Sequence, residues 1–132
     1  MSVTPVRVLI VDDEPDFVEP VVFWLKSKGY DVVTAPDGKQ ALQVFKNAKP
    51  DIVFLDIQMP EMDGIETLRG IREINKRIPV IMVTAAYRDP ANFELATQLG
   101  ATGFFPKQDS LEKLIRLIET TVRLHSKSDS SS

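Results

Sequence analysis

Five short apolar segments recur along the chain, separated by stretches in which apolar residues follow a helical spacing. Each segment is rich in β-branched or aromatic residues and is bounded by turn formers, as buried strands are. The segments start 21 to 28 residues apart, which leaves room for one helix between each pair. This alternation predicts an α/β fold with a parallel sheet and helices on both faces. The predicted strands are Val6–Val11, Tyr30–Ala35, Asp51–Leu55, Pro79–Thr84 and Ala101–Phe105.

Start signals mark the three middle helices. Asp37 can cap the second helix, with Gln40 three residues later, and Gly64 opens the third. Asp89 followed by Pro90 predicts the start of the fourth helix, because proline suits the first helical position.

The first and last helices differ in how clearly the sequence marks them. Pro20 falls inside the first helix, yet the apolar positions around it keep a helical spacing, and Gly29 ends the helix as a left-handed cap. In the last helix Asp109 and Glu112 form the expected cap pair. Its apolar pattern stops at Leu124. We therefore expect one domain over residues 1–124, and a polar, serine-rich, disordered tail or the start of a linker over residues 125–132.

Composition narrows the class of protein. The chain has 132 residues, 43% hydrophobic and 27% charged, an ordinary balance for one globular domain. The absence of cysteine excludes a disulfide scaffold and a thiolate zinc site. A net charge of −3 gives no reason to expect nucleic acid or an anionic membrane as a direct partner. No apolar run is long enough to span a bilayer and the start is not a signal peptide, so we expect a cytoplasmic protein.

Acidic residues follow two of the predicted strands. Asp12 and Asp13 come after the first strand, and Asp56 comes after the third. In the strand order 2-1-3-4-5 these strands are neighbours, and their carboxyl ends flank the switch point where ligands bind. Two carboxylates about 5 Å apart repel by about 3 kcal/mol at an effective dielectric constant of 20. The sequence therefore predicts a bound hard cation such as Mg²⁺.

Two further polar residues end strands at the same edge. Thr84 closes the fourth strand and Lys107 follows the fifth. Carboxylates, a hydroxyl, an ammonium and a metal ion suit phosphoryl transfer to a carboxylate, because positive groups neutralise charge on the phosphoryl oxygens.

The motifs VLIVDDEP, DIVFLDIQMPEMDG, IPVIMVTA and GATGFFPK together resemble the CheY-like receiver domain of response regulators in two-component signalling. The resemblance covers Val6 to Leu124 and implies a single doubly wound (βα)5, flavodoxin-like domain. It implies that Asp56 is the phosphoacceptor. Asp13 and Asp56, with the backbone carbonyl of Gln58, would ligate Mg²⁺, for which Mn²⁺ could substitute, and Asp12 would act beside them.

The resemblance also assigns a switch. Lys107 would pair with Asp56 or the phosphoryl group, Thr84 would turn toward a phosphoryl oxygen, and Phe104 would occupy the aromatic switch position. The phosphoryl donor would be a sensor histidine kinase or a histidine phosphotransfer protein. Such a protein is a signalling receiver that catalyses its own phosphorylation and dephosphorylation, not an enzyme with other substrates.

Output would pass through the face formed by the fourth helix, fifth strand and fifth helix, to an unidentified partner or a carboxyl-terminal output domain. The same face could support a homodimer.

Two departures from the family pattern bear on the switch. Gln108 stands where the family commonly has a proline with a cis peptide, so we expect a trans bond after Lys107. Phe104 stands where tyrosine is frequent, so no phenolic hydrogen bond can hold its inward position. Gln108 also leaves room for an alternative, a degenerate receiver that serves as a protein-binding module without phosphorylation.

Two other readings fit less well. A phosphoaspartate phosphatase of the haloacid-dehalogenase type would need a D-x-D-x-T run after the first strand, where this chain has Asp12-Asp13-Glu14-Pro15. A flavin binder on the same sheet would need a phosphate-cradling loop there, and the carboxylates would repel the flavin phosphate.

Overall fold

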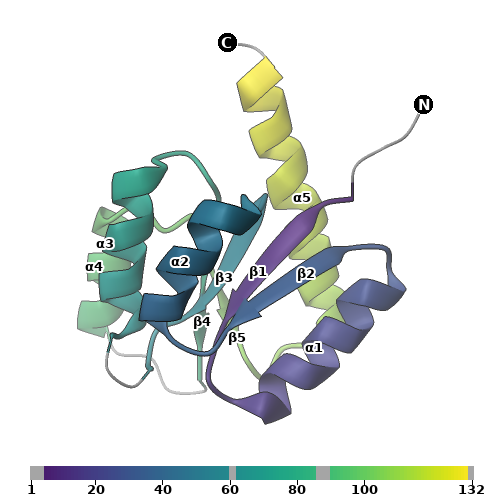
Figure 1. The fold of residues 1–132 in the computed structure, drawn as a ribbon, viewed down its shortest axis with the longest axis horizontal. Helices are drawn as coiled ribbons and strands as arrows, with labels where there is room; N and C mark the ends of the chain where they lie inside the picture. The colour runs from purple at the N-terminus through teal and green to yellow at the C-terminus, as the bar shows by residue number, and fades with distance from the viewer. Residues whose placement is uncertain (1–4, 60–61, 86–89, 131–132) are drawn as a thin grey trace.

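The computed structural model describes residues 5–59, 62–85 and 90–130, and the side chains of these up to Leu124. Strands and helices alternate strictly along the chain (Figure 1). The strands are β1 (Arg7–Val11), β2 (Asp31–Ala35), β3 (Ile52–Asp56), β4 (Val80–Thr84) and β5 (Gly103–Pro106). The helices are α1 (Pro15–Ser27), α2 (Gly38–Ala48), α3 (Gly64–Ile74), α4 (Pro90–Gln98) and α5 (Leu111–Ser130).

The five strands form one parallel sheet in the order β2-β1-β3-β4-β5. This confirms the predicted fold class and strand order, and each predicted strand lies within two residues of an observed one at both ends. The switch point lies between β1 and β3, whose chains continue to helices on opposite faces of the sheet. The carboxyl ends of these two strands therefore flank an open crevice.

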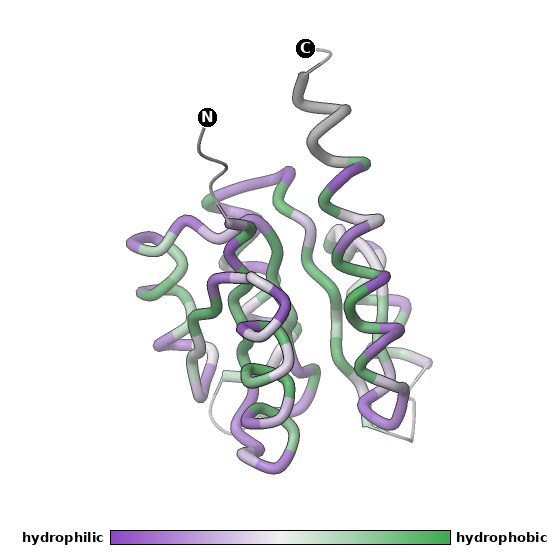
Figure 2. Tube along the Cα trace, turned by 90° about the vertical axis from the view of Figure 1, so that its right-hand side faces the viewer, coloured by the Kyte–Doolittle hydropathy of each residue, from purple (hydrophilic) through white to green (hydrophobic). Residues whose placement is uncertain are grey.

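Side chains that alternate along each strand point to opposite faces of the sheet and belong to two separate hydrophobic cores. Leu9 and Val11 of β1 join the core under α2, α3 and α4, whereas Val8 and Ile10 join the core under α1 and α5. β3 and β4 are buried along their whole length, as expected for the middle of a doubly covered sheet. Figure 2 shows hydrophobic and hydrophilic residues alternating along the helices. The buried apolar residues of the helices pack with those of the strands in the two cores.

Polar side chains start the helices that follow β2, β3 and β5. Asp37 accepts a hydrogen bond from the backbone N–H of Gln40 at 2.8 Å, as predicted. Asp63 caps α3 in the same way. At α5 the predicted pair of Asp109 and Glu112 is wrong, because the helix starts one residue later than that pair requires. Instead Ser110 Oγ accepts a hydrogen bond from the N–H of Lys113 at 3.2 Å.

The two terminal helices differ from the sequence pattern in opposite ways. α1 runs through Pro20 as expected, and Gly29 follows it with a φ of 92°, a conformation that glycine adopts without strain. α5 does not end at Leu124 but continues to Ser130, which corrects the expectation of a disordered tail over these residues. Asp89 and the last two residues of that tail lie outside the described residues. In the part of the chain that is described, no helix has the length and apolar character needed to cross a membrane.

Candidate acidic site at the carboxyl edge of the sheet

Three carboxylates meet at the switch point. Asp12 follows β1 directly, and Asp56 is the last residue of β3. Both are 5% exposed, whereas Asp13 is exposed to solvent. One oxygen atom from each of the three carboxylates lies within 4.8 Å of the others. The structure thus brings together the acidic residues that the strand-end argument predicted.

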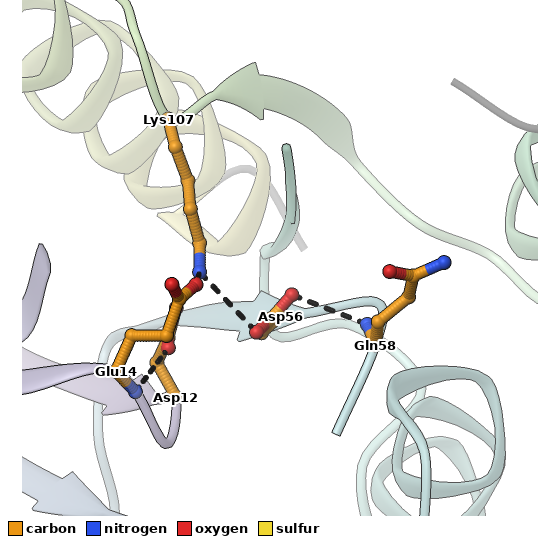
Figure 3. A network of polar contacts seen from close by, with 5 residues as sticks. All are labelled: Asp12, Glu14, Asp56, Gln58 and Lys107. Atoms are coloured by element: carbon orange, nitrogen blue, oxygen red, sulfur yellow. Dashed lines mark hydrogen bonds and ion pairs between the residues drawn. The ribbon is translucent and has the colours of Figure 1, made fainter. Parts of the chain in front are cut away.

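Backbone N–H groups fix the two buried carboxylates. Asp12 Oδ1 accepts a hydrogen bond from the N–H of Glu14 at 2.9 Å. Asp56 Oδ1 accepts one from the N–H of Gln58 at 3.1 Å. Figure 3 shows these two hydrogen bonds and the contact of Lys107 with Asp56. The second carboxylate oxygen of each aspartate, Oδ2, lies within ion-pair distance of Lys107. One oxygen of each acid is therefore held by the loop, and the other faces the shared crevice.

Lys107 reaches this crevice from the loop after β5. Its Nζ lies 3.0 Å from Asp12 Oδ2 and 3.4 Å from Asp56 Oδ2, and it also pairs with Glu14 Oε1. Its backbone N–H donates to the carbonyl of Thr84 at 2.7 Å, which fixes the loop to the end of β4. The described peptide bonds are all trans, including the bond from Lys107 to Gln108, as expected from the missing proline.

Burial and charge shift the pKa values of this cluster. Burial raises the pKa of Asp56 to about 6, and the neighbouring Asp12 adds to the shift, while Lys107 opposes it. Burial also raises the pKa of Asp12, against the hydrogen bond from Glu14. For Lys107, burial lowers the pKa, but hydrogen bonds to Glu14 and Asp12 outweigh burial, so the pKa stays above its usual range. One permanent cation thus faces several carboxylates.

Two predicted switch residues lie on the α4 side of the acidic cluster. Thr84, 5% exposed, ends β4, and its Oγ1 is buried with no hydrogen-bond partner among the described residues. Phe104 belongs to the neighbouring strand β5, where it lies opposite Met82 of β4, and it packs against the core under α4. Its ring stacks on Phe93 of α4 with a centroid distance of 4.0 Å and an interplanar angle of 19°. Phe104 therefore lies apart from the carboxylates, against helix α4.

Helix α3 presses on the backbone of Asp56. A Cβ atom at Gly64 would lie 2.1 Å from the carbonyl oxygen of Asp56 and 2.7 Å from Cα of Ile57, so only glycine fits there. The N–H of Gly64 donates to the carbonyl of Ile57 at 2.9 Å. The first residue of α3 therefore fixes the backbone on which the Asp56 carboxylate stands.

Glu14 was assigned no role from the sequence, yet the structure pairs it with Lys107. Glu14 occupies the N-cap position of α1, where a carboxylate is commonly interpreted as a helix signal, and it makes no side-chain cap there. The only available sign was its place directly after the two aspartates that follow β1.

The donor set fits a hard divalent cation. All nearby ligand atoms are oxygens, which Mg²⁺ prefers, and three carboxylates converge on a space shared with only one ammonium group. The raised pKa values of Asp12 and Asp56 indicate that one lysine does not balance the buried negative charge. These residues would gain from an added cation.

Comparison with known proteins decides the family. A model of the family described as "Response regulator receiver domain" matches residues 8–119. This chain is a member of that family. Among curated relatives, the receiver domain is 38% identical over 122 residues to the transcriptional regulatory protein TrcR of Mycobacterium tuberculosis, covering 91% of this chain and 46% of TrcR. It is 33% identical to the alkaline phosphatase synthesis transcriptional regulatory protein PhoP of Bacillus subtilis, covering 89% and 48%.

Solved structures agree with this assignment. The receiver domain is similar to the chemotaxis protein CheY4 of Vibrio cholerae, with a TM-score of 0.83 and 30% identity over 89% of this chain and 98% of that one. A CheY-like receiver domain from Methanospirillum hungatei gives a TM-score of 0.90 at 26% identity, over 95% and 99%. The chain spans about half the length of the curated relatives it matches. It is a receiver domain of two-component response regulators, a family whose general function is to accept a phosphoryl group.

Proposed function

We propose that Asp56 is the phosphoacceptor and that this receiver domain works as a phosphorylation-controlled switch. A carboxylate oxygen of Asp56 would attack the phosphorus of a phosphohistidine. The new O–P bond forms as the P–N bond breaks, and the electron pair of that bond leaves with the imidazole. A pKa of about 6 keeps most of the Asp56 carboxyl group ionised at neutral pH, so it is available as a nucleophile.

Asp13, Asp56 and the backbone carbonyl of Gln58 would hold Mg²⁺, with Asp12 beside them. When bound, the ion would neutralise negative charge on the phosphoryl oxygens. Asp12 and Asp56 are already oriented for this by the backbone N–H groups of Glu14 and Gln58, so ordering them costs little on binding. Mn²⁺, which prefers the same ligands, would substitute.

Lys107 and Thr84 would respond to the phosphoryl group. The ammonium of Lys107 lies 3.4 Å from Asp56 Oδ2, close enough to pair with a phosphoryl oxygen attached there. The buried hydroxyl of Thr84 lacks a hydrogen-bond partner in this structure, which gives it a reason to turn toward a new acceptor. Movement of Thr84 and Phe104 would then alter the face formed by α4, β5 and α5.

The partners follow from this chemistry. In the cytoplasm, where this protein would act, a sensor histidine kinase or a histidine phosphotransfer protein would supply the phosphoryl group. The altered face of α4, β5 and α5 would contact an output partner, a further domain or a second copy of the receiver. The curated relatives include proteins named as transcriptional regulators, which supports an output in gene regulation.

The carrying observation is the buried Asp56 carboxylate, held beside two further carboxylates and a lysine at the switch point. The test is intact mass after incubation with acetyl phosphate, with and without Mg²⁺. We expect the wild-type protein to gain one phosphoryl group only with Mg²⁺. Asp56→Asn should gain none, a loss of at least about 100-fold in labelling. Asp16→Asn, which removes an exposed carboxylate from the first turn of α1, should label like the wild type.

Labelling of Asp56→Asn that still depends on Mg²⁺ would refute the assignment of the acceptor. No labelling of any variant has two explanations, a degenerate receiver or rapid hydrolysis. Titration with beryllofluoride, which occupies the phosphoryl position without being hydrolysed, separates them. Failure to bind it would favour the phosphorylation-independent binding module.

A further inference from the structure

Phe104 and Phe93 form a stacked pair that joins β5 to α4. The rings lie nearly parallel, with centroids 4.0 Å apart. Phe104 is half-buried against the core, whereas Phe93 is 38% exposed and covers it from the solvent side. Among the described residues this is the only ring-on-ring contact. The Phe93 ring therefore shields one side of the Phe104 ring from solvent.

The absence of a hydroxyl makes this stack more important. A phenylalanine ring is held in place only by burial and by contacts with other apolar groups. A stacked aromatic pair adds attraction beyond the buried area. The position of Phe104 is thus set by the balance between its contacts with the core and its contact with Phe93.

The stack shares a face of the sheet with Thr84. Thr84 Oγ1 is buried with no hydrogen-bond partner among the described residues. Thr84 ends β4, and α4, which carries Phe93, is the next helix in the chain. Thr84 and Met82 are two residues apart in β4, so their side chains lie on the same face of the sheet. Phe104 of β5 packs on that face as well. Thr84, Phe104 and Phe93 therefore follow one another across this face toward α4.

We propose that Phe93 is the latch of the aromatic switch. Its ring holds Phe104 against α4 in the unphosphorylated state, and the two rings separate when Thr84 and Phe104 shift on phosphorylation. Phe93 would then lose its partner and change the surface of α4 at the point where output is expected. Phe93 touches no reacting atom, so it acts through Phe104 as a positioning residue. This inference rests on the proposed function.

The test is the affinity for beryllofluoride in the presence of Mg²⁺. Binding is measured from the backbone amide signals in NMR spectra as beryllofluoride is added. Phe93→Ala removes the stack, so the phosphorylated-like state should form more easily. We expect half-saturation at a beryllofluoride concentration about two- to tenfold lower than for the wild type. Phe93→Leu keeps an apolar cover without the stack and should shift in the same direction by less. Leu95→Ala removes another exposed apolar side chain from α4 and should match the wild type.

A second measurement addresses the stack itself. The ring protons of Phe104 should show ring-current shifts in the wild type that disappear in Phe93→Ala and also when the wild type binds beryllofluoride. Unchanged ring signals on binding, or an affinity of both Phe93 variants equal to that of Leu95→Ala, would overturn the latch. Weaker binding by the Phe93 variants would overturn it as well. If the wild type itself fails to bind beryllofluoride, the proposed function fails first.

Discussion

The two ends of the sheet both carry ion pairs, but in opposite surroundings. At the amino end, Arg7 Nε lies 2.6 Å from Asp31 Oδ2, and the two side chains are 41% and 43% exposed. At the carboxyl end, Lys107 faces Asp12 and Asp56, whose side chains are only 1% and 7% exposed. The amino-end pair lies in water, where charge is screened and contributes little. The carboxyl-end cluster holds excess negative charge away from water, which lowers its own contribution to stability and favours the binding of a cation.

The largest expected difference between the two ends comes from removing each cation. Lys107→Gln leaves Asp12 and Asp56 buried without their ammonium partner, so we expect the free energy of unfolding to fall by about 3–5 kcal/mol. Arg7→Gln removes the cation of the half-exposed pair and should cost about 0–1 kcal/mol. Urea unfolding of both variants at pH 7.5, with a chelator present, measures the two costs. Equal losses in the free energy of unfolding would contradict the difference between the buried cluster and the half-exposed pair.

The next effect is a pH dependence that only the carboxyl end should show. The pKa of Asp56 is raised to about 6 in the folded protein from an ordinary 3.8, so the folded state binds this proton more tightly. The favourable contribution is complete only well below pH 3.8 and is lost as pH rises through about 6. Wild-type stability should therefore fall, relative to Asp56→Asn, by about 2 kcal/mol between pH 4 and pH 7.

Urea unfolding across this pH range, in chelator, tests the prediction. Asp31→Asn, which removes a half-exposed carboxylate from the amino end, is the matched control. An advantage of Asp56→Asn that stays constant from pH 4 to pH 7 would contradict the prediction. Adding Mg²⁺ should reduce the advantage, because the ion stabilises the ionised site.

The smallest effect concerns an ordinary structural group at the carboxyl end. Ser110 caps α5 in the loop that also carries Lys107, so Ser110→Ala should lower the free energy of unfolding by about 1 kcal/mol. Asp109→Ala, at the neighbouring position, should change it by less than about 0.5 kcal/mol. Thermal or urea unfolding separates the two variants. The reverse order would restore Asp109 as the cap.

The features predicted correctly are those governed by repeated patterns. Buried β-branched runs mark all five strands, and the rule that parallel strands end at one edge predicts that Asp12, Asp56 and Lys107 lie together. The strand ends were less exact. β5 continues to Pro106, one residue beyond the predicted end, because proline is tolerated at the end of an edge strand.

The features missed depend on single side chains or on weak end signals. Whether Glu14 caps α1 or turns to Lys107 is decided by side-chain rotamers and by the position of β5, neither of which the local sequence encodes. Asp109 and Ser110 are both good capping residues, so the helix start could be placed at either. After Leu124 the apolar pattern ends, but no proline or glycine follows to stop α5. The stacking of Phe93 on Phe104 joins two distant elements and has no sequence signal.

The contact between Gly64 and the backbone of Asp56 has a mechanical consequence. With α3 resting against the carbonyl of Asp56, the strand end cannot slide or rotate without displacing a whole helix that is anchored in the core by Ile65, Leu68 and Ile71. The Asp56 carboxylate is thus a fixed reference point. If Asp56 is the acceptor, as proposed, displacement caused by a new charge would be directed to the opposite side, where single side chains such as Thr84 and Phe104 can move separately. The architecture would then set the direction in which a signal leaves the site.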